Sequence, residues 1–486
     1  MKKLGQSHFQ CIIVGGGIVG AGIFRDLALH GVETLLIDSG DFSAQTSERS
    51  SKMLHGGIRY LENMDFKLVF EALHEKNLWL KLTPHLAREE AFFLPVYKNA
   101  GRPLWMIRLG LFLYDLLSQF KNSPYKTLSQ EECIKRIPDL NPKGLSGAGV
   151  YYDGIMDDVK ITLEVIYDSL LMPNTYALNH TMLTNVSIDP QTNNSLLTLI
   201  DQLTGEKQVV SAEKVIYALG PFTDSFLTRY PFYAWKNVLL PSKGSHIWIS
   251  KNDLPLNHPI VMTPKDEFGD RVIFVIPHNE KILIGTTEVP SSGDLFHVTP
   301  SKDEINYLLK NLNSYFPKLN LNESHVIGSF AGIRPLVKEN ENSIDRGKTS
   351  REHKVYRPLK NTYVIAGGKY TTFRVMGQAI TKEICQAFNK NYDSNLTKKA
   401  LRQKSIVLPF EWKLPTGEEL ELICQREAPR TLEDLIKRRL SIVSIKNWEL
   451  KTKENIEDYV IKNREILNRY MDVGASALSE LLKAIR

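Results

Sequence analysis

The stretch QCIIVGGGIVGAGIFRDLALHGVETLLID, residues 10–38, constrains the fold of this chain more than any other. Four apolar residues ending at Val14 predict a short buried strand, and apolar residues at helical spacing from 18 to 28 predict a helix. Gly31 suits the position just past a helix end, and residues 34–37 predict a second buried strand. The stretch therefore predicts an α/β unit in which a glycine turn joins the first strand to the helix.

Three glycines of this turn, Gly15, Gly17 and Gly20, have the spacing GxGxxG. The first permits a tight turn, the second lets the backbone approach a pyrophosphate, and the third lets helix and strand pack closely. The helix N-terminus then faces the phosphates with its positive end. Asp38 follows the second strand, where an acid accepts the hydroxyls of a ribose. The unit predicts dinucleotide binding, although the motif does not separate FAD from NAD.

Small hydroxyl side chains crowd the loop that follows Asp38. Thr46, Ser47, Ser50 and Ser51 precede Lys52 there. By composition such a stretch is either a solvated loop or a set of donors for a pyrophosphate and a cofactor ring. Its position directly after the ribose acid favours cofactor contact.

The heptapeptide LHGGIRY, residues 54–60, comes next. It places a titratable base, His55, close to a cation, Arg59, and a phenol, Tyr60, around two glycines. One interpretation is a glycine turn with polar decoration. The other is a site where a small anionic substrate is oxidised, because histidine titrates near neutral pH and arginine binds anions.

Eight segments together carry a resemblance to a known family: VGGGIVGAG, TSERSSKMLHGGIRYLE, WMIRLGLFLYD, LPSKGSHIWI, RVIFVIP, ILIGTTEV, FAGIRPL and IAGGKYTTFR. In this order they resemble the FAD-dependent glycerol-3-phosphate dehydrogenases, which belong to the D-amino-acid-oxidase-like flavoproteins. The similarity runs from about residue 8 to about residue 445. It implies FAD as cofactor, oxidation of sn-glycerol 3-phosphate to dihydroxyacetone phosphate, a role in glycerol metabolism, and quinone as electron acceptor.

The resemblance implies an α/β + α architecture with three parts. We expect a discontinuous Rossmann-like FAD-binding domain, an antiparallel-sheet substrate domain and an all-α C-terminal domain. Short β-rich runs between 235 and 330 agree with the antiparallel sheet. The expected boundaries are 1–90, 150–232 and 326–395 for the first domain, 91–149 and 233–325 for the second, and 396–486 for the third.

The resemblance also implies roles for individual residues. Arg59, Arg334 and Lys369 would hold the substrate phosphate with help from Tyr60. His55 is the first candidate for the general base and His246 the second. The expected cofactor-binding residues are Gly15, Gly17, Gly20, Asp38, Thr46, Ser47, Ser51, Lys52, Gly220, Gly368, Thr371 and Thr372. Two positions depart from the family pattern, because Lys160 stands where an arginine is usual and Glu288 where an aspartate is usual.

Composition narrows the cellular setting. The net charge of +6 is small for 486 residues and does not call for nucleic acid, although it helps capture anionic substrates or lipid headgroups. Four widely spaced cysteines fit a reducing cytoplasm, and we expect no metal site. No apolar run is long enough to span a membrane. The apolar segment 104–117 is either an interfacial helix or a core helix of the substrate domain.

Cysteine usage predicts a cytoplasmic protein, the resemblance implies peripheral binding to the inner face of the cytoplasmic membrane, and a homodimer is left open. Four alternatives remain at this point. They are a glycerol-3-phosphate oxidase that uses O2, an amine or amino-acid oxidase of the same fold, an NAD-dependent dehydrogenase, and a flavoprotein that serves as a binding or RNA-modification module.

Overall fold

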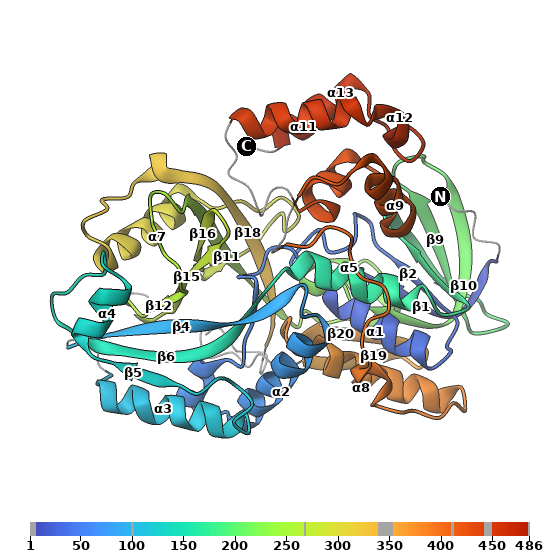
Figure 1. Cartoon of the computed structure of the whole chain (residues 1–486). Helices are drawn as coiled ribbons and strands as arrows, with labels where there is room; N and C mark the ends of the chain where they lie inside the picture. Colours follow the sequence, from blue (N-terminus) through green and yellow to red (C-terminus); the bar gives the residue numbers. More distant parts are fainter. Residues whose placement is uncertain are drawn as a thin grey trace.

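Two large sheets lie side by side in the computed structural model, with a group of helices above one of them (Figure 1). The structure describes residues 6–98, 102–266, 269–338, 353–409, 413–441 and 450–484. The chain passes between the sheets several times, because segments from the first half and from the second half of the sequence contribute strands to both.

The first sheet has eight strands and contains the N-terminal α/β unit. Its main order is β19-β20-β10-β1-β2-β7, and β9 and β8 continue from β10. The pairs around β1 are parallel, whereas β19 and β9 pair antiparallel with their neighbours. The strands are β1 (His8–Val14), β2 (Thr34–Ile37), β7 (Thr175–Leu178), β8 (Thr181–Ile188), β9 (Ser195–Asp201), β10 (Lys207–Tyr217), β19 (His353–Leu359) and β20 (Thr362–Gly367).

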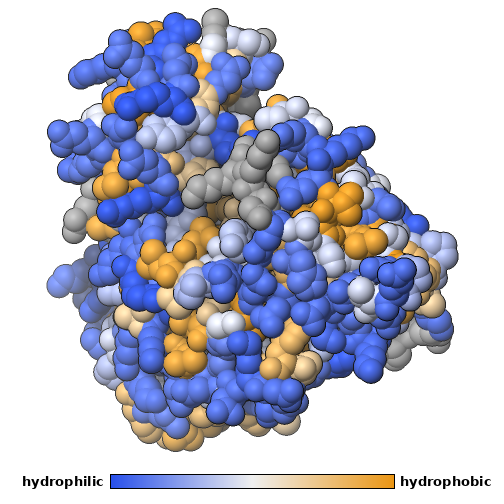
Figure 2. Space-filling model, turned by 90° about the vertical axis from the view of Figure 1, so that its right-hand side faces the viewer, coloured by the Kyte–Doolittle hydropathy of each residue, from blue (hydrophilic) through white to orange (hydrophobic). Residues whose placement is uncertain are grey.

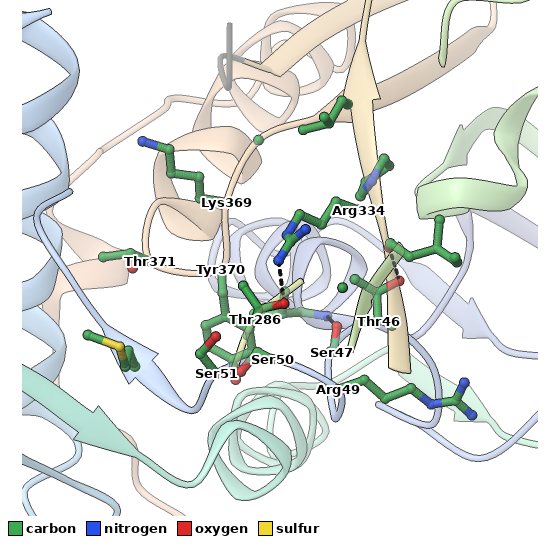
Figure 3. A pocket seen from close by; sticks show the side chains of 18 of the residues that line it. Thr46, Ser47, Arg49, Ser50, Ser51, Thr286, Arg334, Lys369, Tyr370 and Thr371 are labelled. Atoms are coloured by element: carbon green, nitrogen blue, oxygen red, sulfur yellow. Dashed lines mark hydrogen bonds between the residues drawn. The ribbon is translucent and has the colours of Figure 1, made fainter. Parts of the chain in front are cut away.

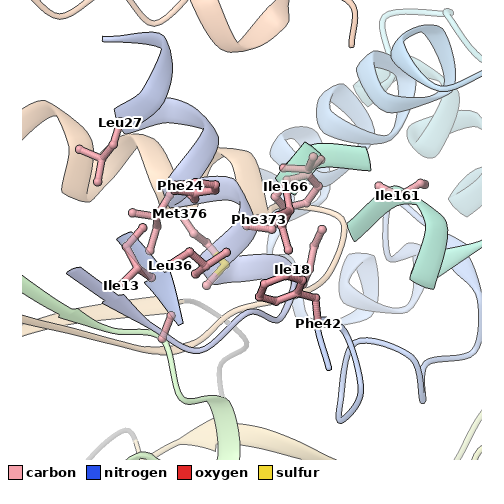
Figure 4. Packing of buried hydrophobic residues seen from close by; sticks show 14 of the residues in the cluster. Ile13, Ile18, Phe24, Leu27, Leu36, Phe42, Ile161, Ile166, Phe373 and Met376 are labelled. Atoms are coloured by element: carbon pink, nitrogen blue, oxygen red, sulfur yellow. The ribbon is translucent and has the colours of Figure 1, made fainter. Parts of the chain in front are cut away.

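Three helices cover one face of this sheet: α1 (Ile18–Leu29), α5 (Asp158–Ser169) and α8 (Phe373–Ala387). Their apolar side chains pack against those of β1 and β2 in one buried cluster (Figure 4). Phe24 of α1 and Met376 of α8 are fully buried in this cluster. Because burial of apolar surface is the main driving force of folding, this cluster holds the glycine turn at the start of α1 in place.

The second sheet has ten strands and is mainly antiparallel. Its main order is β17-β11-β16-β15-β12-β4-β6-β3, with β18 beside β11 and β5 beside β6. Its one parallel pair among the described residues joins β12 to β4. The strands are β3 (Met53–Leu54), β4 (Ala87–Tyr97), β5 (Lys126–Leu128), β6 (Leu145–Met156), β11 (Leu239–Ser250), β12 (Ile260–Met262), β15 (Ile273–His278), β16 (Lys281–Gly285), β17 (Val289–Pro290) and β18 (Val326–Val337).

Strand β18 shows where the expected domain boundaries need correction. We expected residues 326–395 in the FAD-binding domain, but β18 pairs with β11 along its whole length, from Val326 to Val337. The antiparallel register places the second sheet's boundary near residue 338 in this region. The short strand β3 likewise pairs with β6 in the second sheet, although it lies within 1–90. The other boundaries stay predictions.

Further helices and short elements complete the fold around the two sheets. Those that accompany the second sheet are α2 (Phe66–Leu82), α3 (Leu104–Leu117), α4 (Gln130–Arg136) and α7 (Lys302–Tyr315). The short elements are η1 (Ile58–Asn63), η2 (Gly220–Phe222), α6 (Thr223–Leu227), η3 (Pro231–Tyr233), η4 (Glu323–His325), η5 (Leu396–Lys398) and the strand pair β13 (Lys265–Asp266) and β14 (Gly269–Asp270).

The C-terminal region is helical, as expected, and has its own apolar core. It contains α9 (Gly417–Glu427), a π-helical turn η6 (Asp434–Arg439), α11 (Leu450–Lys462), α12 (Arg464–Leu467) and α13 (Ala475–Ala484). Leu420, Leu435 and Leu467 are fully buried in this core. The region lies above the first sheet in Figure 1.

Helix α3 is not the core helix that one interpretation of segment 104–117 expected. Only Leu111, Tyr114 and Asp115 of its residues are buried, whereas Trp105 is 66% exposed and Leu109 is 52% exposed. No helix in the described part of the chain combines the length and apolar character needed to span a bilayer. Figure 2 shows one face of the molecule, which is mostly hydrophilic with separate apolar patches.

Candidate active site

A cavity of about 1220 Å³ lies between the two sheets and is lined by residues of both. It is larger than the roughly 300–1,000 Å³ that is common for pockets of small ligands. The part of its wall that contains Asp38 and the glycine turn is called the cofactor end, and His55, Arg334 and residues of α3 also line the cavity. Its size and lining suit a dinucleotide with a substrate beside it.

The glycine turn forms the wall at the start of α1. Gly15 follows β1 with a φ of +113°, a conformation that favours glycine. A Cβ on Gly20 would lie 1.8 Å from the carbonyl oxygen of Gly15, so helix and turn can approach this closely only without a side chain. The first N–H groups of α1 therefore stand at the cavity wall, and the turn is a cradle that fits a pyrophosphate.

Asp38 lies at the same end, directly after β2. Its carboxylate accepts hydrogen bonds from the backbone N–H groups of Gly16 at 2.6 Å and of Gly40 at 2.8 Å. Burial is the largest influence on this carboxyl and raises its pKa to about 6, against the effect of the two N–H donors. The donor set and position fit an acceptor for ribose hydroxyls.

The hydroxyl-rich loop contributes Thr46, Ser47 and Ser51 to the cavity wall (Figure 3). The Ser47 hydroxyl accepts a hydrogen bond from the Ile18 N–H at 2.9 Å, which joins the loop to the start of α1. The Thr46 hydroxyl donates to the Ile333 carbonyl oxygen at 2.9 Å, which joins it to β18. The loop is thus held to both sheets at the cofactor end of the cavity.

Lys52 and Thr372 differ from their expected roles as cofactor contacts. The Lys52 ammonium is buried 2.6 Å from the Asp158 carboxylate, and its neighbours Ser51 and Met53 form the cavity wall instead. Thr372 is buried at the start of α8, while Thr371 lines the cavity. A buried ammonium needs a paired charge, which explains why Lys52 turns to Asp158.

The HGGIRY turn forms another part of the cavity wall. The His55 N–H donates to the Thr371 hydroxyl at 3.3 Å, and the Gly56 N–H donates to Asp153 Oδ1 at 3.3 Å. Gly57 has a φ of +74° and precedes η1, from which Arg59 and Tyr60 reach the cavity. The turn is therefore held by bonds to Thr371, which lies just before α8, and to Asp153 of β6.

Three expected substrate cations line this one cavity: Arg59, Arg334 and Lys369. The Lys369 ammonium lies 3.7 Å from the centre of the Tyr60 ring, a distance typical of a cation–π contact. Through this contact Tyr60, which follows Arg59, can help to position the ammonium of Lys369, which is remote in the sequence.

Arg334 projects from β18 toward the end of β16 (Figure 3). Its Nη2 donates to the Thr286 hydroxyl at 2.8 Å and its Nη1 donates to the Thr287 carbonyl oxygen at 3.3 Å. Glu288, one of the two departures from the family pattern, lines the same part of the cavity. The guanidinium is thus held at the cavity wall by the segment that follows β16.

The two candidate bases have different surroundings. His246 on β11 is 2% exposed, and its Nε2 shares a hydrogen bond of 2.9 Å with the Ser51 hydroxyl. Burial, followed by the charges of Arg334 and Lys52, lowers the pKa of His246 to about 3. A histidine with so low a pKa is a weak base at neutral pH, which counts against His246 as the general base. The assignment of His55 stays a prediction.

Lys160, the other departure, lies away from the cavity wall formed by the described residues. Its ammonium is buried, contacts Glu427 Oε2 at 3.4 Å, and donates to the Arg439 carbonyl oxygen. Both partners belong to the C-terminal region. A lysine in place of arginine at this position therefore concerns the attachment of that region and not the substrate.

One residue with a clear role at the site escaped the sequence interpretation. Asp153 of β6 is 1% exposed, lines the cavity, and holds Gly56 and the Tyr114 hydroxyl, the latter at 2.8 Å. Lys76 Nζ lies 3.6 Å from the same carboxylate. The only signal was an acid inside an otherwise buried strand, YYDGIM, which by itself does not indicate what the acid contacts.

Comparison with known proteins agrees with this geometry. The DAO model, FAD dependent oxidoreductase, matches residues 10–383. The alpha-glycerophosphate oxidase of Streptococcus pyogenes serotype M6 is 29% identical, over 81% of this chain and 72% of the relative. The aerobic glycerol-3-phosphate dehydrogenase of Staphylococcus aureus strain MRSA252 is 32% identical, over 80% of this chain and 69% of the relative.

Among solved structures, the glycerol-3-phosphate dehydrogenase of Bacillus halodurans complexed with FAD has the same fold, with a TM-score of 0.75. It is 22% identical, and the match covers 99% of this chain and 95% of that one. The predicted fold class and cofactor are confirmed. The chain belongs to the DAO family of FAD-dependent oxidoreductases, and FAD is its cofactor.

Proposed function

We propose that this chain oxidises sn-glycerol 3-phosphate to dihydroxyacetone phosphate. The observation that carries the proposal is one cavity that contains the glycine turn, His55, and the cations Arg59, Arg334 and Lys369. A phosphate dianion calls for several cations, and arginine binds it through a planar pair of N–H groups. The names of the two sequence relatives, an alpha-glycerophosphate oxidase and a glycerol-3-phosphate dehydrogenase, support the same substrate.

Oxidation of the alcohol removes a hydride from C2 and a proton from the C2 hydroxyl. FAD, when bound, supplies the hydride acceptor. His55 takes the hydroxyl proton, and the bond from its backbone to Thr371 keeps the residue at the edge of the turn. Arg59, Arg334 and Lys369 hold the phosphate, so that the carbinol carbon faces the cofactor. The hydrogen bonds of Arg334 to Thr286 and Thr287 hold its guanidinium in position before the substrate binds.

An amine or amino-acid oxidase is the nearest alternative with the same fold. Its substrate carries one carboxylate and one amine, and so does not need three cations at the site. The decisive experiment is anaerobic addition of glycerol 3-phosphate to the purified holoprotein while the flavin absorbance near 450 nm is followed. Bleaching by glycerol 3-phosphate supports the proposal. Bleaching by D-amino acids or sarcosine instead would overturn it.

We further propose quinone as the electron acceptor, in preference to O2. The part of the cavity wall contributed by β4, α3 and β15 is apolar and includes Leu94, Val96, Ile107, Leu113 and Phe274. An apolar acceptor needs such an apolar wall, whereas O2 does not. Reoxidation of the reduced protein by a short-chain quinone should be much faster than by air-saturated buffer. Faster reoxidation by O2 would favour an oxidase.

We also propose that the protein lies at the inner surface of the cytoplasmic membrane, because α3 carries exposed apolar side chains. Together with exposed apolar side chains of neighbouring elements they form an apolar patch, whose members are Met64, Phe66, Phe70, Trp105, Met106, Leu109, Phe112, Leu116 and Phe120. Exposed apolar residues in such number mark an interaction surface. Arg108 lies within the helix itself, as in helices that bind anionic lipid headgroups.

Cosedimentation with vesicles of phosphatidylglycerol and phosphatidylcholine tests this surface. The double substitution Trp105→Ser and Phe112→Ser should reduce the bound fraction strongly. Val209→Ser is a matched control, because Val209 is 56% exposed but belongs to β10 of the first sheet. Equal loss of binding in both variants, or no loss in the double variant, would count against the α3 face.

A further inference from the structure

The C-terminal segment 430–441 contacts the loop that forms the cofactor end of the cavity. Two consecutive arginines of this segment, Arg438 and Arg439, bind the carboxylate of Asp41. Arg438 Nε donates to Asp41 Oδ2 at 2.6 Å, and Arg439 Nη2 donates to Oδ1 at 2.9 Å. The segment lies outside residues 10–383, which the family model matches.

Asp41 stands at a sensitive point of the cofactor site. It lines the cavity three residues after Asp38, and the N–H of Ser43, two residues further on, donates to the Gly16 carbonyl oxygen in the glycine turn at 3.0 Å. Arg438 Nη1 also donates to Glu48 at 3.2 Å. One guanidinium therefore holds both ends of the segment 41–48, which contains Thr46 and Ser47.

Burial makes these contacts strong. The side chains of Arg439 and Asp41 are both fully buried, and that of Arg438 is 4% exposed. Water and salt screen such charges little, and removal of one partner leaves an uncompensated charge in the interior. The loop is therefore tied to the C-terminal segment more firmly than surface ion pairs could achieve.

A metal site is the other interpretation of this cluster. Asp41, His180 and Asp434 offer ligand atoms close to one another. The guanidinium groups of Arg438 and Arg439 already bind the two carboxylates, and His180 Nε2 shares a hydrogen bond of 2.8 Å with Asp434. Positive groups occupy the positions that a cation would need, so the cluster is an ion-pair network.

We propose that Arg438 is a positioning residue for the cofactor: the C-terminal segment holds the loop 41–48 in the shape that binds FAD. The affinity of the protein for FAD then depends on a region outside residues 10–383, which the family model matches. This inference rests on FAD as cofactor and not on the proposed substrate. Either proposal can therefore fail while the other one stands.

The test is the dissociation constant for FAD, measured by fluorescence titration of the apoprotein of the full chain. Arg438→Gln should raise it roughly 10- to 100-fold, the range expected when hydrogen bonds to a charged group are lost. Arg438→Lys keeps the charge and should restore part of the affinity. Arg402→Gln is the matched control, because Arg402 binds Asp168 at 3.1 Å, away from the loop.

The outcomes are distinct. A folded Arg438→Gln protein with wild-type affinity for FAD would overturn the proposal. So would an equal loss of affinity in Arg402→Gln, because any weakened C-terminal contact would then suffice. If Arg438→Gln does not fold, Glu48→Gln replaces it, since the Glu48 side chain is 19% exposed and easier to neutralise. That variant should weaken FAD binding several-fold, and an unchanged dissociation constant would also overturn the proposal.

Discussion

Gly244 of β11 offers a way to move Arg334 without removing it. A Cβ at this position would lie 2.5 Å from Arg334 Nη2 and 2.6 Å from the Thr286 hydroxyl oxygen. Real side chains do not approach so closely, so Gly244→Ala must displace the guanidinium by about 1 Å from its position on Thr286. Both contacts are with the ends of side chains, so the backbone of the sheet can stay in place.

The expected effect follows from this displacement. A misplacement of about 1 Å in a group that positions substrate can lower kcat/KM about 100-fold. At about 1.36 kcal/mol for each tenfold change, this is a loss of about 2.7 kcal/mol in transition-state stabilisation. The free energy of unfolding should change much less, because no buried apolar group is removed. FAD affinity should also stay close to that of the wild type, since the glycine turn is untouched.

The assay is stopped-flow reduction of the flavin by glycerol 3-phosphate under anaerobic conditions, over a range of substrate concentrations. Gly328→Ala on the adjacent strand β18 is the control, because its Cβ would lie 3.6 Å from Trp248, an ordinary van der Waals distance. A Gly244→Ala protein with full FAD occupancy and the substrate dependence of the wild type would refute the reasoning. Arg334 would then have no part in holding the substrate.

Three further predictions test other parts of the site. Burial raises the pKa of Asp38 to about 6 and the ribose hydroxyls favour the ionised carboxylate, so the dissociation constant for FAD should rise as the pH falls from 7 to 5. The Asp38→Asn variant should bind FAD weakly with no such pH dependence, and a pH dependence that persists in this variant would contradict the prediction. His55→Asn should slow flavin reduction roughly 10²- to 10⁴-fold, the usual contribution of a general base; His246→Asn should cost less, and the opposite order in stopped-flow measurements would exchange their roles. Lys52→Met leaves Asp158 buried without its partner, which should lower the free energy of unfolding by about 3–5 kcal/mol in urea titrations; an unchanged midpoint would show that Asp158 is neutral in the folded protein.

The cofactor end of the site was readable from the sequence because its determinants are local. Strand, glycine turn, helix, second strand and Asp38 lie within 29 consecutive residues. Their backbone geometry follows from glycine spacing and apolar periodicity alone. The structure confirms the three elements: β2 spans the predicted residues 34–37, α1 begins at Ile18 as predicted and ends one residue later, at Leu29, and β1 ends at Val14 as predicted but begins earlier, at His8.

The contacts of several buried charged residues could not be predicted from local sequence patterns. Lys52 and Lys160 stand in segments that resemble cofactor and substrate motifs, yet both turn to buried carboxylates, Asp158 and Glu427. Asp153 carried no local signal, although it holds the HGGIRY turn. The partner of a buried charge is set by what other segments bring near it, and those segments are remote in sequence.

The sequence by itself therefore determined the α/β unit, its dinucleotide turn and the set of side chains with chemistry to offer, because these depend on near neighbours along the chain. The tertiary structure alone decided which of them meet. The pairing of β18 with β11 brings Arg334 to Thr286, and the turn before α8 brings Lys369 to Tyr60. It also decided that the last helical region reaches back to the cofactor loop, since an ion pair between residues 41 and 439 depends on the path of the whole chain between them.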